Sequence, residues 1–354
     1  MPRTAPGEAA DHVPWSLPPG DLDDGIERSE ADLSVVAGAR ILVTGGTGFL
    51  GSWLVASLIR ANARLGLGMQ IVVLTRQPAS ALLDGFPSVS ILRGDVRSMP
   101  DPGPVDVIVH GATTSSSTYG QGDGDPRVMA ATIVDGTRAV LDAAAGRHSR
   151  VLFLSSGAVY GPQVGTVAED APSSLDSMDP RSAYGEAKRL AENLCAAATA
   201  AGEVEAVVAR LFAFVGPRIP LGVHFAAGNF LDDALNGRPI VVRGDGVPRR
   251  SFLYAGDLPE WCWALLVRGR SGTAYNVGSP DAVTIEALAR RAASLVTPAV
   301  EVEILGVPSD GPVSWYVPST ALAESEFGLR PRTSLEVGLR KTFAWLSARP
   351  RGLI

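Results

Sequence analysis

The sequence predicts a doubly wound α/β fold of the Rossmann type, in which helices cover a parallel sheet, with a smaller C-terminal substrate-binding lobe. Short apolar runs rich in valine, isoleucine and leucine alternate with longer stretches of helical periodicity. The first apolar run leads into a glycine-rich turn, Gly45 to Gly51, and a long amphipathic stretch follows it. Such alternation implies right-handed βαβ units and a sheet that is buried on both faces.

The strands and helices of the sheet are expected between residues 40 and 211. Each predicted strand is a short apolar run in which β-branched residues are frequent. The six runs are Arg40–Thr44, Gln70–Thr75, Val89–Arg93, Val105–His110, Arg150–Ser155 and Glu205–Leu211. Three helices are expected between them, because apolar residues recur there at helical spacing. They are Gly48–Leu65, Pro126–Ala145 and Ser182–Ala201.

Three segments are expected along the chain: a partly flexible leader over residues 1–37, a dinucleotide-binding domain over 38–215 and a mainly substrate-binding lobe over 216–354. The first twenty residues carry five prolines and are expected to be loose, whereas Asp21–Val36 has a weak helical spacing. After Gly216 the elements become shorter, and a return of this part of the chain to the sheet is left open. The lobe is expected to hold strands Pro239–Arg243 and Thr273–Val277 and helices His224–Asn236, Asp257–Val267, Thr284–Leu295 and Ser334–Ser347.

Composition excludes several classes of protein. The 354 residues are 46% hydrophobic and 19% charged, which is unlike a disordered chain, and two cysteines are too few for a disulfide scaffold. A net charge of −6 argues against nucleic acid as a partner. No apolar run approaches the roughly 18 residues of a membrane span, and the N-terminus has no secretory signal. We expect a cytoplasmic protein without a metal site.

The glycine-rich turn predicts a dinucleotide site. Gly45, Gly48 and Gly51 have the GxxGxxG spacing, with a predicted strand before them and a predicted helix after them. The first glycine allows a tight turn, the second lets the backbone approach a pyrophosphate, and the third lets helix and strand pack closely. The phosphates are expected at the positive N-terminus of the helix, so Thr47, Phe49 and Leu50 belong to the expected cofactor site.

The end of the second predicted strand favours NADP(H) over NAD. An NAD site usually places Asp or Glu about 20 residues after the glycine motif, where it binds the ribose 2′-hydroxyl. Thr75 and Arg76 stand there instead, and residues 66–82 contain no acidic side chain. A guanidinium can bind a 2′-phosphate with two parallel hydrogen bonds. NAD remains the alternative cofactor.

Tyr184 and Lys188 are the candidate catalytic residues. They are four residues apart and therefore share one face of the predicted helix. A nearby ammonium is expected to lower the pKa of the tyrosine, which is about 10 in solution. Lys188 is one of only two lysines among 31 basic residues, so a role that arginine cannot fill is expected for it. Ser155 and Ser156 end the preceding strand, and Ser156 is expected to bond the substrate oxygen that Tyr184 protonates.

Several motifs occur in the order found in one enzyme family. They are Thr44-Gly-Gly-Thr-Gly-Phe-Leu-Gly51, Gly94-Asp-Val96, His110-Gly-Ala-Thr113, Ser155-Ser-Gly-Ala-Val-Tyr-Gly161, Tyr184xxxLys188, Arg210-Leu-Phe-Ala-Phe-Val-Gly-Pro217, Gly244-Asp-Gly-Val-Pro-Arg-Arg250-Ser-Phe and Tyr275-Asn-Val-Gly278. Over about residues 38–348 the chain resembles the extended short-chain dehydrogenase/reductases, the nucleotide-sugar epimerases, dehydratases and reductases. The resemblance implies a nicotinamide cofactor at the sheet and a nucleotide-sugar substrate at the lobe.

The resemblance also assigns residues to these ligands. Asp95 would meet the adenine and Arg250 the substrate diphosphate, with Asn229 a weaker candidate for a phosphate contact. The cofactor-binding set then comprises Gly45, Thr47, Gly48, Phe49, Leu50, Gly51, Thr75, Arg76, Asp95, Val96, His110, Ala112, Thr113, Tyr184 and Lys188, and the substrate-binding set Ser156, Asn229 and Arg250.

Departures from the family pattern narrow the reaction. The 4,6-dehydratases carry Asp and Glu directly after the catalytic hydroxyl, whereas this chain has Gly157 and Ala158 and so lacks the acid and base for water elimination. Ile133 and Ala213 stand where the family usually has asparagine. We expect NADPH-dependent reduction of the C4 ketone of a nucleotide-linked, dTDP-type 4-keto-6-deoxyhexose, as in deoxysugar and antibiotic-sugar biosynthesis.

Three other functions stay open. They are a 4-epimerase with tightly held NAD, a 4,6-dehydratase, and a non-catalytic dinucleotide sensor. The resemblance also implies a homodimer, because in relatives the helix that carries the tyrosine pairs with the one before the fifth strand. Both helices are rich in alanine in this chain, which permits close packing.

Overall fold

The computed structural model describes residues 14–76, 83, 85–113, 125–147, 149–222, 225–307 and 311–348. The chain forms two compact units. The first, called the sheet unit here, runs to Val159 and also contains Asp176–Arg210 and Gly256–Tyr275. The second unit contains Tyr160–Leu175, Leu211–Ala255 and the chain from Asn276 onward. The sequence analysis placed one boundary after residue 215 and left a return open, and Gly256–Tyr275 is such a return.

The sheet unit is built on one parallel sheet, which confirms the predicted fold class. Within the described residues the strand order is β11-β6-β5-β4-β1-β2-β3. The strands are β1 Arg40–Thr44, β2 Gln70–Thr75, β3 Val89–Arg93, β4 Val107–His110, β5 Arg150–Ser156, β6 Glu205–Leu211 and β11 Ala274–Val277. Strand β11, expected in the lobe, joins the sheet because its backbone pairs with β6, for example from Val208 N to Thr273 O at 3.0 Å.

The strand order reverses between β1 and β4. Strands β1 and β4 pair with each other. Strand β2 pairs with the free side of β1, and β5 pairs with the free side of β4. In open α/β sheets the crevice at the carboxyl ends of such strands is where ligands bind. Thr44 and His110 form the last pair of the β1–β4 register, so the end of β4 lies beside the glycine-rich turn that follows β1.

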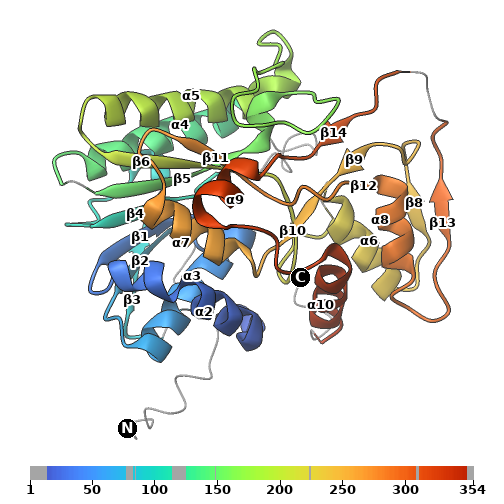
Figure 1. Ribbon diagram of the computed structural model, residues 1–354, viewed down its shortest axis with the longest axis horizontal. Helices are drawn as coiled ribbons and strands as arrows, with labels where there is room; N and C mark the ends of the chain where they lie inside the picture. The colour runs from blue at the N-terminus through green and yellow to red at the C-terminus, as the bar shows by residue number, and fades with distance from the viewer. Residues whose placement is uncertain are drawn as a thin grey trace, which may run out of the picture. The chain divides into compact units, whose positions relative to one another are not determined.

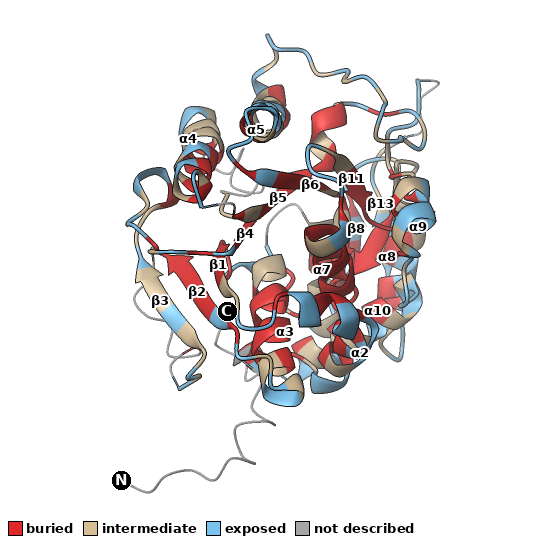
Figure 2. Cartoon of the chain, turned by 60° about the vertical axis from the view of Figure 1, so that its left-hand side comes forward, coloured by how far each residue is buried: buried red, intermediate tan, exposed pale blue. Residues whose placement is uncertain are grey.

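Helices cover both faces of the sheet (Figure 1). One face carries α4 (Pro126–Ala144) and α5 (Ala183–Ala200), and the other carries α2 (Pro19–Val35), α3 (Phe49–Leu65) and α7 (Leu258–Arg268). Figure 2 shows that most of the sheet and the inward sides of these helices are buried, whereas the edge strand β3 and the outward sides of the helices are partly or fully exposed. The α4 and α5 side is filled by apolar residues of β1, β2, β4, β5 and β6, as expected for a sheet buried on both faces.

Helix α2 lies within the segment that the sequence analysis treated as a leader. Its apolar residues Leu22, Ile26 and Leu33 are at most 2% exposed and pack in the sheet unit against α3 and α7. Ion pairs border this contact: Asp23 with Arg60 at 2.6 Å, Arg28 with Glu260 at 2.6 Å and Asp32 with Arg268 at 2.8 Å. The helix is therefore part of the sheet unit. Residues 1–13, most of the stretch expected to be loose, lie outside the described part.

The second unit is built from short elements. Its strands pair as β7 (Ala213–Val215) with β10 (Phe252–Tyr254), β8 (Ile240–Val242) with β13 (Val302–Ile304), and β9 (Arg249–Arg250) with both β12 (Val283–Thr284) and β14 (Trp315–Tyr316). Its helices are α6 (Ala226–Leu235), α8 (Ile285–Ala293), α9 (Ala321–Phe327) and α10 (Leu335–Ser347). The short helices η1 Pro14–Ser16, η2 Val96–Ser98, η4 Gly157–Tyr160 and η5 Pro180–Ser182 complete the described elements.

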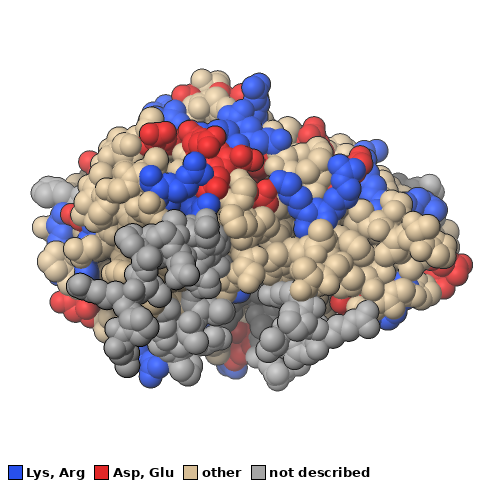
Figure 3. Space-filling model, turned by 90° about the horizontal axis from the view of Figure 1, so that it is seen from below, with Lys and Arg blue, Asp and Glu red and all other residues tan. Residues whose placement is uncertain are grey.

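Charged side chains of both signs are mixed on the surface. On the face shown in Figure 3, Lys and Arg lie beside Asp and Glu, and no extended area of one sign is visible among the described residues. None of the helices in the described ranges is long and apolar enough to span a bilayer. The same ranges contain no cluster of His, Cys, Asp and Glu that could hold a metal ion.

Candidate functional site

The glycine-rich turn is a cradle that larger residues would fill. Gly45 has a positive φ of 74°, and a Cβ there would lie 2.6 Å from the backbone of Gly111. A Cβ on Gly51 would lie 2.1 Å from the carbonyl oxygen of Gly45. Helix α3 begins at Phe49. The residue before it, Gly48, has an extended conformation and no side chain that could cap the helix. The first N–H groups of α3 are thus left for an anionic ligand.

His110 supports this turn from the interior. Gly111 N and Ala112 N donate hydrogen bonds to Thr44 Oγ1 at 3.2 and 3.1 Å, and Thr44 Oγ1 lies 2.7 Å from His110 Nδ1. His110 Nε2 lies 3.1 Å from Thr137 Oγ1, which in turn donates to a helical carbonyl. The only consistent direction of protons leaves Nδ1 as acceptor and Nε2 as donor, a neutral ring.

Burial keeps His110 neutral. It lowers the pKa of the imidazole to about 3, and the positive charge of Lys188 contributes to the same shift. Both ring nitrogens are engaged inside the sheet unit, so neither is left to contact a cofactor. Any role of His110 in binding passes through Gly111 and Ala112, which it holds next to Gly45 by way of Thr44.

The other predicted cofactor residues lie around the same strand ends. Arg76 is exposed directly after β2, and its charge helps lower the pKa of Asp95. The Asp95 carboxylate is mainly held by Arg97, through the side chain at 2.9 and 3.0 Å and the backbone N–H at 2.9 Å, and its pKa falls to about 2. It is therefore a charged acceptor at the end of β3. Val96 is 5% exposed and belongs to the apolar core.

The remaining members of the predicted set follow the ends of β1 and β4 or end β2. Thr47 lies in the glycine-rich turn, Phe49 and Leu50 open α3, and Ala112 and Thr113 follow β4. Thr75 is the last residue of β2 and is buried. The structure thus gathers them at the carboxyl ends of the parallel strands, as the fold predicts.

Ser156, Tyr184 and Lys188 come together between β5 and α5. Ser156 ends β5 and forms a side-chain hydrogen bond with the half-buried Tyr184. One helical turn further, Lys188 is 2% exposed, and its Nζ donates to Leu154 O at 2.8 Å. Nζ also lies 4.8 Å from the centroid of the Phe153 ring. The predicted catalytic residues are therefore held against one strand by one helix.

The electrostatics of this group differ from the expectation. Burial raises the pKa of Tyr184 above its usual value, and the hydrogen bond from Ser156 opposes that shift only in part. The Lys188 ammonium, in contrast, donates to Leu154 O and lies over the Phe153 ring. Burial also lowers the pKa of Lys188 to about 8, against the opposing effect of Glu192. The prediction that Lys188 lowers the pKa of Tyr184 is thus wrong for the chain alone.

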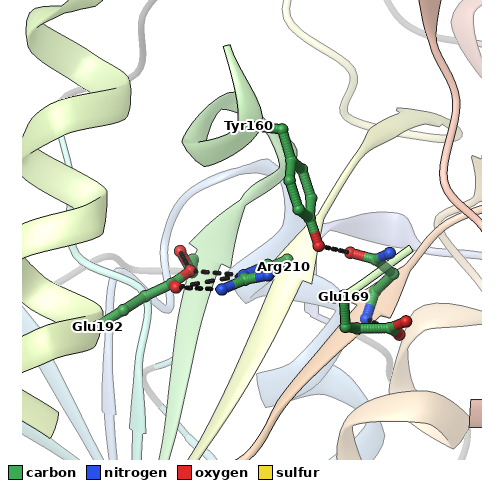
Figure 4. A network of polar contacts seen from close by, with 6 residues as sticks. Tyr160, Glu169, Glu192 and Arg210 are labelled. Atoms are coloured by element: carbon green, nitrogen blue, oxygen red, sulfur yellow. Dashed lines mark hydrogen bonds and ion pairs between the residues drawn. The ribbon is translucent and has the colours of Figure 1, made fainter. Parts of the chain in front are cut away.

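The two serines have separate roles. Ser155 Oγ donates to Glu192 Oε1 at 2.5 Å, while Ser156 bonds Tyr184. Glu192 also accepts a forked pair of hydrogen bonds from Arg210 of β6, with Nη2 at 2.8 Å from Oε2 and Nε at 3.1 Å from Oε1 (Figure 4). Sequence reasoning missed Glu192. Its position four residues after Lys188, on the same helix face, was the available signal.

The other two predicted substrate residues, Asn229 and Arg250, belong to the second unit. Asn229 lies in α6 and accepts a hydrogen bond from Gly222 N at 3.0 Å. Arg250 lies in β9, where its Nη1 donates to Arg249 O at 2.8 Å, and burial lowers the pKa of its guanidinium. A separate network there joins Tyr160, whose hydroxyl donates to Asn276 Oδ1 at 2.8 Å, with Glu169, which accepts from Asn276 N at 2.9 Å (Figure 4).

Comparison with known proteins places this geometry in a family. A sequence model of the NAD dependent epimerase/dehydratase family matches residues 41–278. The chain belongs to this family. UDP-glucuronic acid decarboxylase 6 of Arabidopsis thaliana is 31% identical over 301 residues, which is 85% of this chain and 86% of that protein. The resemblance predicted from the motifs is therefore confirmed at the level of the family.

Solved structures of epimerase/dehydratase proteins share the fold. The epimerase Mth375 of Methanothermobacter thermautotrophicus superimposes with a TM-score of 0.75 at 21% identity, covering 91% of this chain and 96% of that one. MoeE5, in complex with UDP-glucuronic acid and NAD, superimposes with a TM-score of 0.71 at 26% identity, covering 87% and 98%. The glycine cradle, the uncapped start of α3 and the charged Asp95 fit a dinucleotide in this chain.

Proposed function

We propose that this member of the epimerase/dehydratase family reduces the C4 ketone of a nucleotide-linked 4-keto-6-deoxyhexose with NADPH. One observation carries the proposal: Ser156 at the end of β5 is hydrogen-bonded to Tyr184 of α5, and no carboxylate directly follows Ser156, because Gly157 and Ala158 occupy the next positions. Proton donation is available there, whereas the acid and base for elimination of water are not. The carboxylate of Glu192 is held by Ser155 and Arg210.

The residues of the sheet unit then have distinct tasks. Ser156 Oγ donates a hydrogen bond to the ketone oxygen and orients it. Tyr184 delivers its hydroxyl proton to O4 as the alkoxide forms, and the raised pKa of Tyr184 keeps that proton on the phenol near neutral pH. Lys188 places a positive charge behind the pair. The hydride is the chemistry that NADPH supplies when bound.

The nucleotide-sugar substrate is proposed to meet the second unit through Arg250 and Asn229. Arg250 is a partly buried cation whose pKa is lowered by desolvation, so an anionic partner would stabilise its charged form. A diphosphate is such a partner and accepts two parallel hydrogen bonds from a guanidinium. Two of the proteins named above, the UDP-glucuronic acid decarboxylase and MoeE5, are associated with a UDP sugar, so activity on the dTDP substrate should be compared directly with activity on its UDP counterpart.

A 4-epimerase that keeps NAD bound is the second candidate, since Mth375 is an epimerase and MoeE5 binds NAD. The nucleotide released from the purified protein on denaturation separates the two. We expect an empty site that NADPH fills, with NADPH oxidation on addition of dTDP-4-keto-6-deoxyglucose. We expect no 4-keto product from dTDP-glucose. Tightly bound NAD together with interconversion of C4 epimers would favour the epimerase proposal over the reductase proposal. Dehydration of dTDP-glucose would contradict both proposals.

Arg76→Asp should shift cofactor preference from NADPH towards NADH. The exposed guanidinium after β2 is the proposed partner of the 2′-phosphate, and a charge-assisted hydrogen bond of this kind is worth roughly 1.5–3 kcal/mol. The dissociation constants of NADPH and NADH, measured by fluorescence titration, report the change. Arg340→Asp, on the exposed side of α10, is the matched control for the introduced acid. An unchanged NADPH constant would make Arg76 an ordinary loop residue.

We also propose a homodimer formed through α4 and α5. These helices pack against each other on one face of the sheet, and each carries an exposed apolar side chain, Val128 at 48% and Leu190 at 45%. Sedimentation velocity at micromolar concentration should show a dimer. Leu190→Glu should shift the protein towards monomer, because burying a carboxylate in an apolar contact is costly. A wild-type monomer would contradict the assembly.

A further inference from the structure

Helix α5 carries a third functional position after Tyr184 and Lys188. Glu192 follows Lys188 by four residues, so the three side chains lie along one face of the helix. The Glu192 side chain is 12% exposed, and its carboxylate accepts hydrogen bonds from Ser155 of β5 and, in a forked contact, from Arg210 of β6. An exposed ion pair contributes little to stability, whereas this carboxylate is mostly buried and is held by side chains of two strands.

Lys188 lacks a direct ion-pair partner in the described residues. Its Nζ donates to the carbonyl of Leu154 and faces the Phe153 ring, and neither neutralises the ammonium. An amine that is only 2% exposed is costly to keep charged unless an anion is near. Glu192 is the carboxylate whose charge acts on it, and it is held on the strand residue directly after Leu154.

We propose that Glu192 is a positioning residue that holds Lys188 in its protonated form, with Ser155 and Arg210 fixing the carboxylate where it can do so. The charges support this role. Glu192 is ion-paired with Arg210 and follows Lys188 by one helical turn, so its negative charge offsets both cations. Without Glu192, the repulsion between Lys188 and Arg210 would be uncompensated.

Other groups around Lys188 do not replace Glu192. On α5, Tyr184 is neutral and Cys195 is a buried thiol whose pKa is raised to about 12. On β4, His110 is neutral. The buried residues of α4 include no titratable side chain. Arg210 of β6 contacts the Glu192 carboxylate and, as a cation, is expected to oppose the protonation of Lys188. The effect of Glu192 on catalysis rests on the proposed function. Its effect on the protonation of Lys188 does not depend on that function.

The chain contains only two lysines, Lys188 and Lys341, which permits a direct test on the apoprotein. Lysine labelled with 13C at Cε should give two titrating NMR signals, and Lys341→Arg identifies that of Lys188. We expect a wild-type pKa near 8. In Glu192→Gln the midpoint should fall by about one unit or more, the usual effect of a close opposite charge. An unchanged midpoint would overturn the proposal.

Matched variants separate charge from structure. Glu186→Gln removes another carboxylate of α5, one paired with Arg189, and should leave the Lys188 midpoint in place. Arg210→Gln removes the competing cation and should raise the midpoint, so the sign of the effect can be read even if Glu192→Gln does not fold. A fall or no change in Arg210→Gln would contradict the charge argument.

Activity provides the second readout. If Lys188 must be protonated, the rate of NADPH oxidation falls as the pH rises through its pKa, and in Glu192→Gln that alkaline limb should move to lower pH by the shift seen by NMR. If the Lys188 midpoint shifts in Glu192→Gln but the wild type has no ketoreductase activity, the role of Glu192 stands and the proposed reaction is refuted. If the alkaline limb of the pH–rate profile shifts but the NMR midpoint does not, the role of Glu192 is refuted.

Discussion

Tyr184→Phe should lower kcat for NADPH-dependent reduction by roughly 10²–10⁴, the usual contribution of a positioned general acid. The change removes one oxygen atom and keeps the ring, so the packing of α5 on β5 should hardly change. It also leaves the ketone oxygen with the hydrogen bond of Ser156 but without a proton donor. NADPH oxidation at 340 nm, with the ready-made 4-ketosugar as substrate, measures the loss.

The affinities for both ligands should stay close to those of wild type, because neither pyrophosphate is proposed to depend on the phenol. Tyr160→Phe is the matched control. It also removes one phenolic oxygen, but that oxygen bonds Asn276 in the second unit, so it should cost stability by about 1 kcal/mol and leave kcat unchanged. Undiminished reduction by Tyr184→Phe would remove the catalytic assignment.

Ser156→Ala should lower kcat by about 10²–10³, the cost of losing one donor to a developing oxyanion. The hydroxyl bonds Tyr184 in the structure and is proposed to orient the ketone, so its loss affects both partners of the proton transfer. Single-turnover rates with saturating NADPH separate this chemical effect from binding.

The neighbouring serine is the comparison for this experiment. Ser155→Ala removes a hydroxyl that is donated to Glu192, not to Tyr184. It should lower the stability of the protein by about 1–3 kcal/mol, as expected for a buried hydrogen bond to a charged group, with a much smaller loss of kcat. Equal losses of kcat in the two variants would contradict the division of roles between them.

Much of the sheet unit could be predicted from sequence because its signals are local. A valine-rich run such as Gln70–Thr75 predicts a buried strand, and the glycine spacing from Gly45 to Gly51 predicts the turn that the structure shows. The membership of β11 in the sheet could not be predicted. It depends on pairing between Val208 and Thr273, which are far apart in the chain.

The same distinction holds within the candidate site. Tyr184 and Lys188 were found by their spacing along one helix. The direction of the Lys188 ammonium was not, since it depends on a carbonyl of β5 and on the Phe153 ring. The sequence therefore predicted which side chains meet, but not that Lys188 bonds the strand in the chain alone. The forked contact of Glu192 with Arg210 joins two elements and leaves no local pattern.

Helix α2 determines where a recombinant fragment of this protein can begin. The family match starts at residue 41, which lies after the helix, so a fragment cut there would lose Pro19–Val35. The surfaces of α3 and α7 that α2 covers would then be bare apolar patches, and Glu260, 5% exposed in the chain, would lose the guanidinium of Arg28. Such a fragment would be prone to aggregation. A recombinant fragment that is meant to keep these surfaces covered should therefore begin ahead of α2.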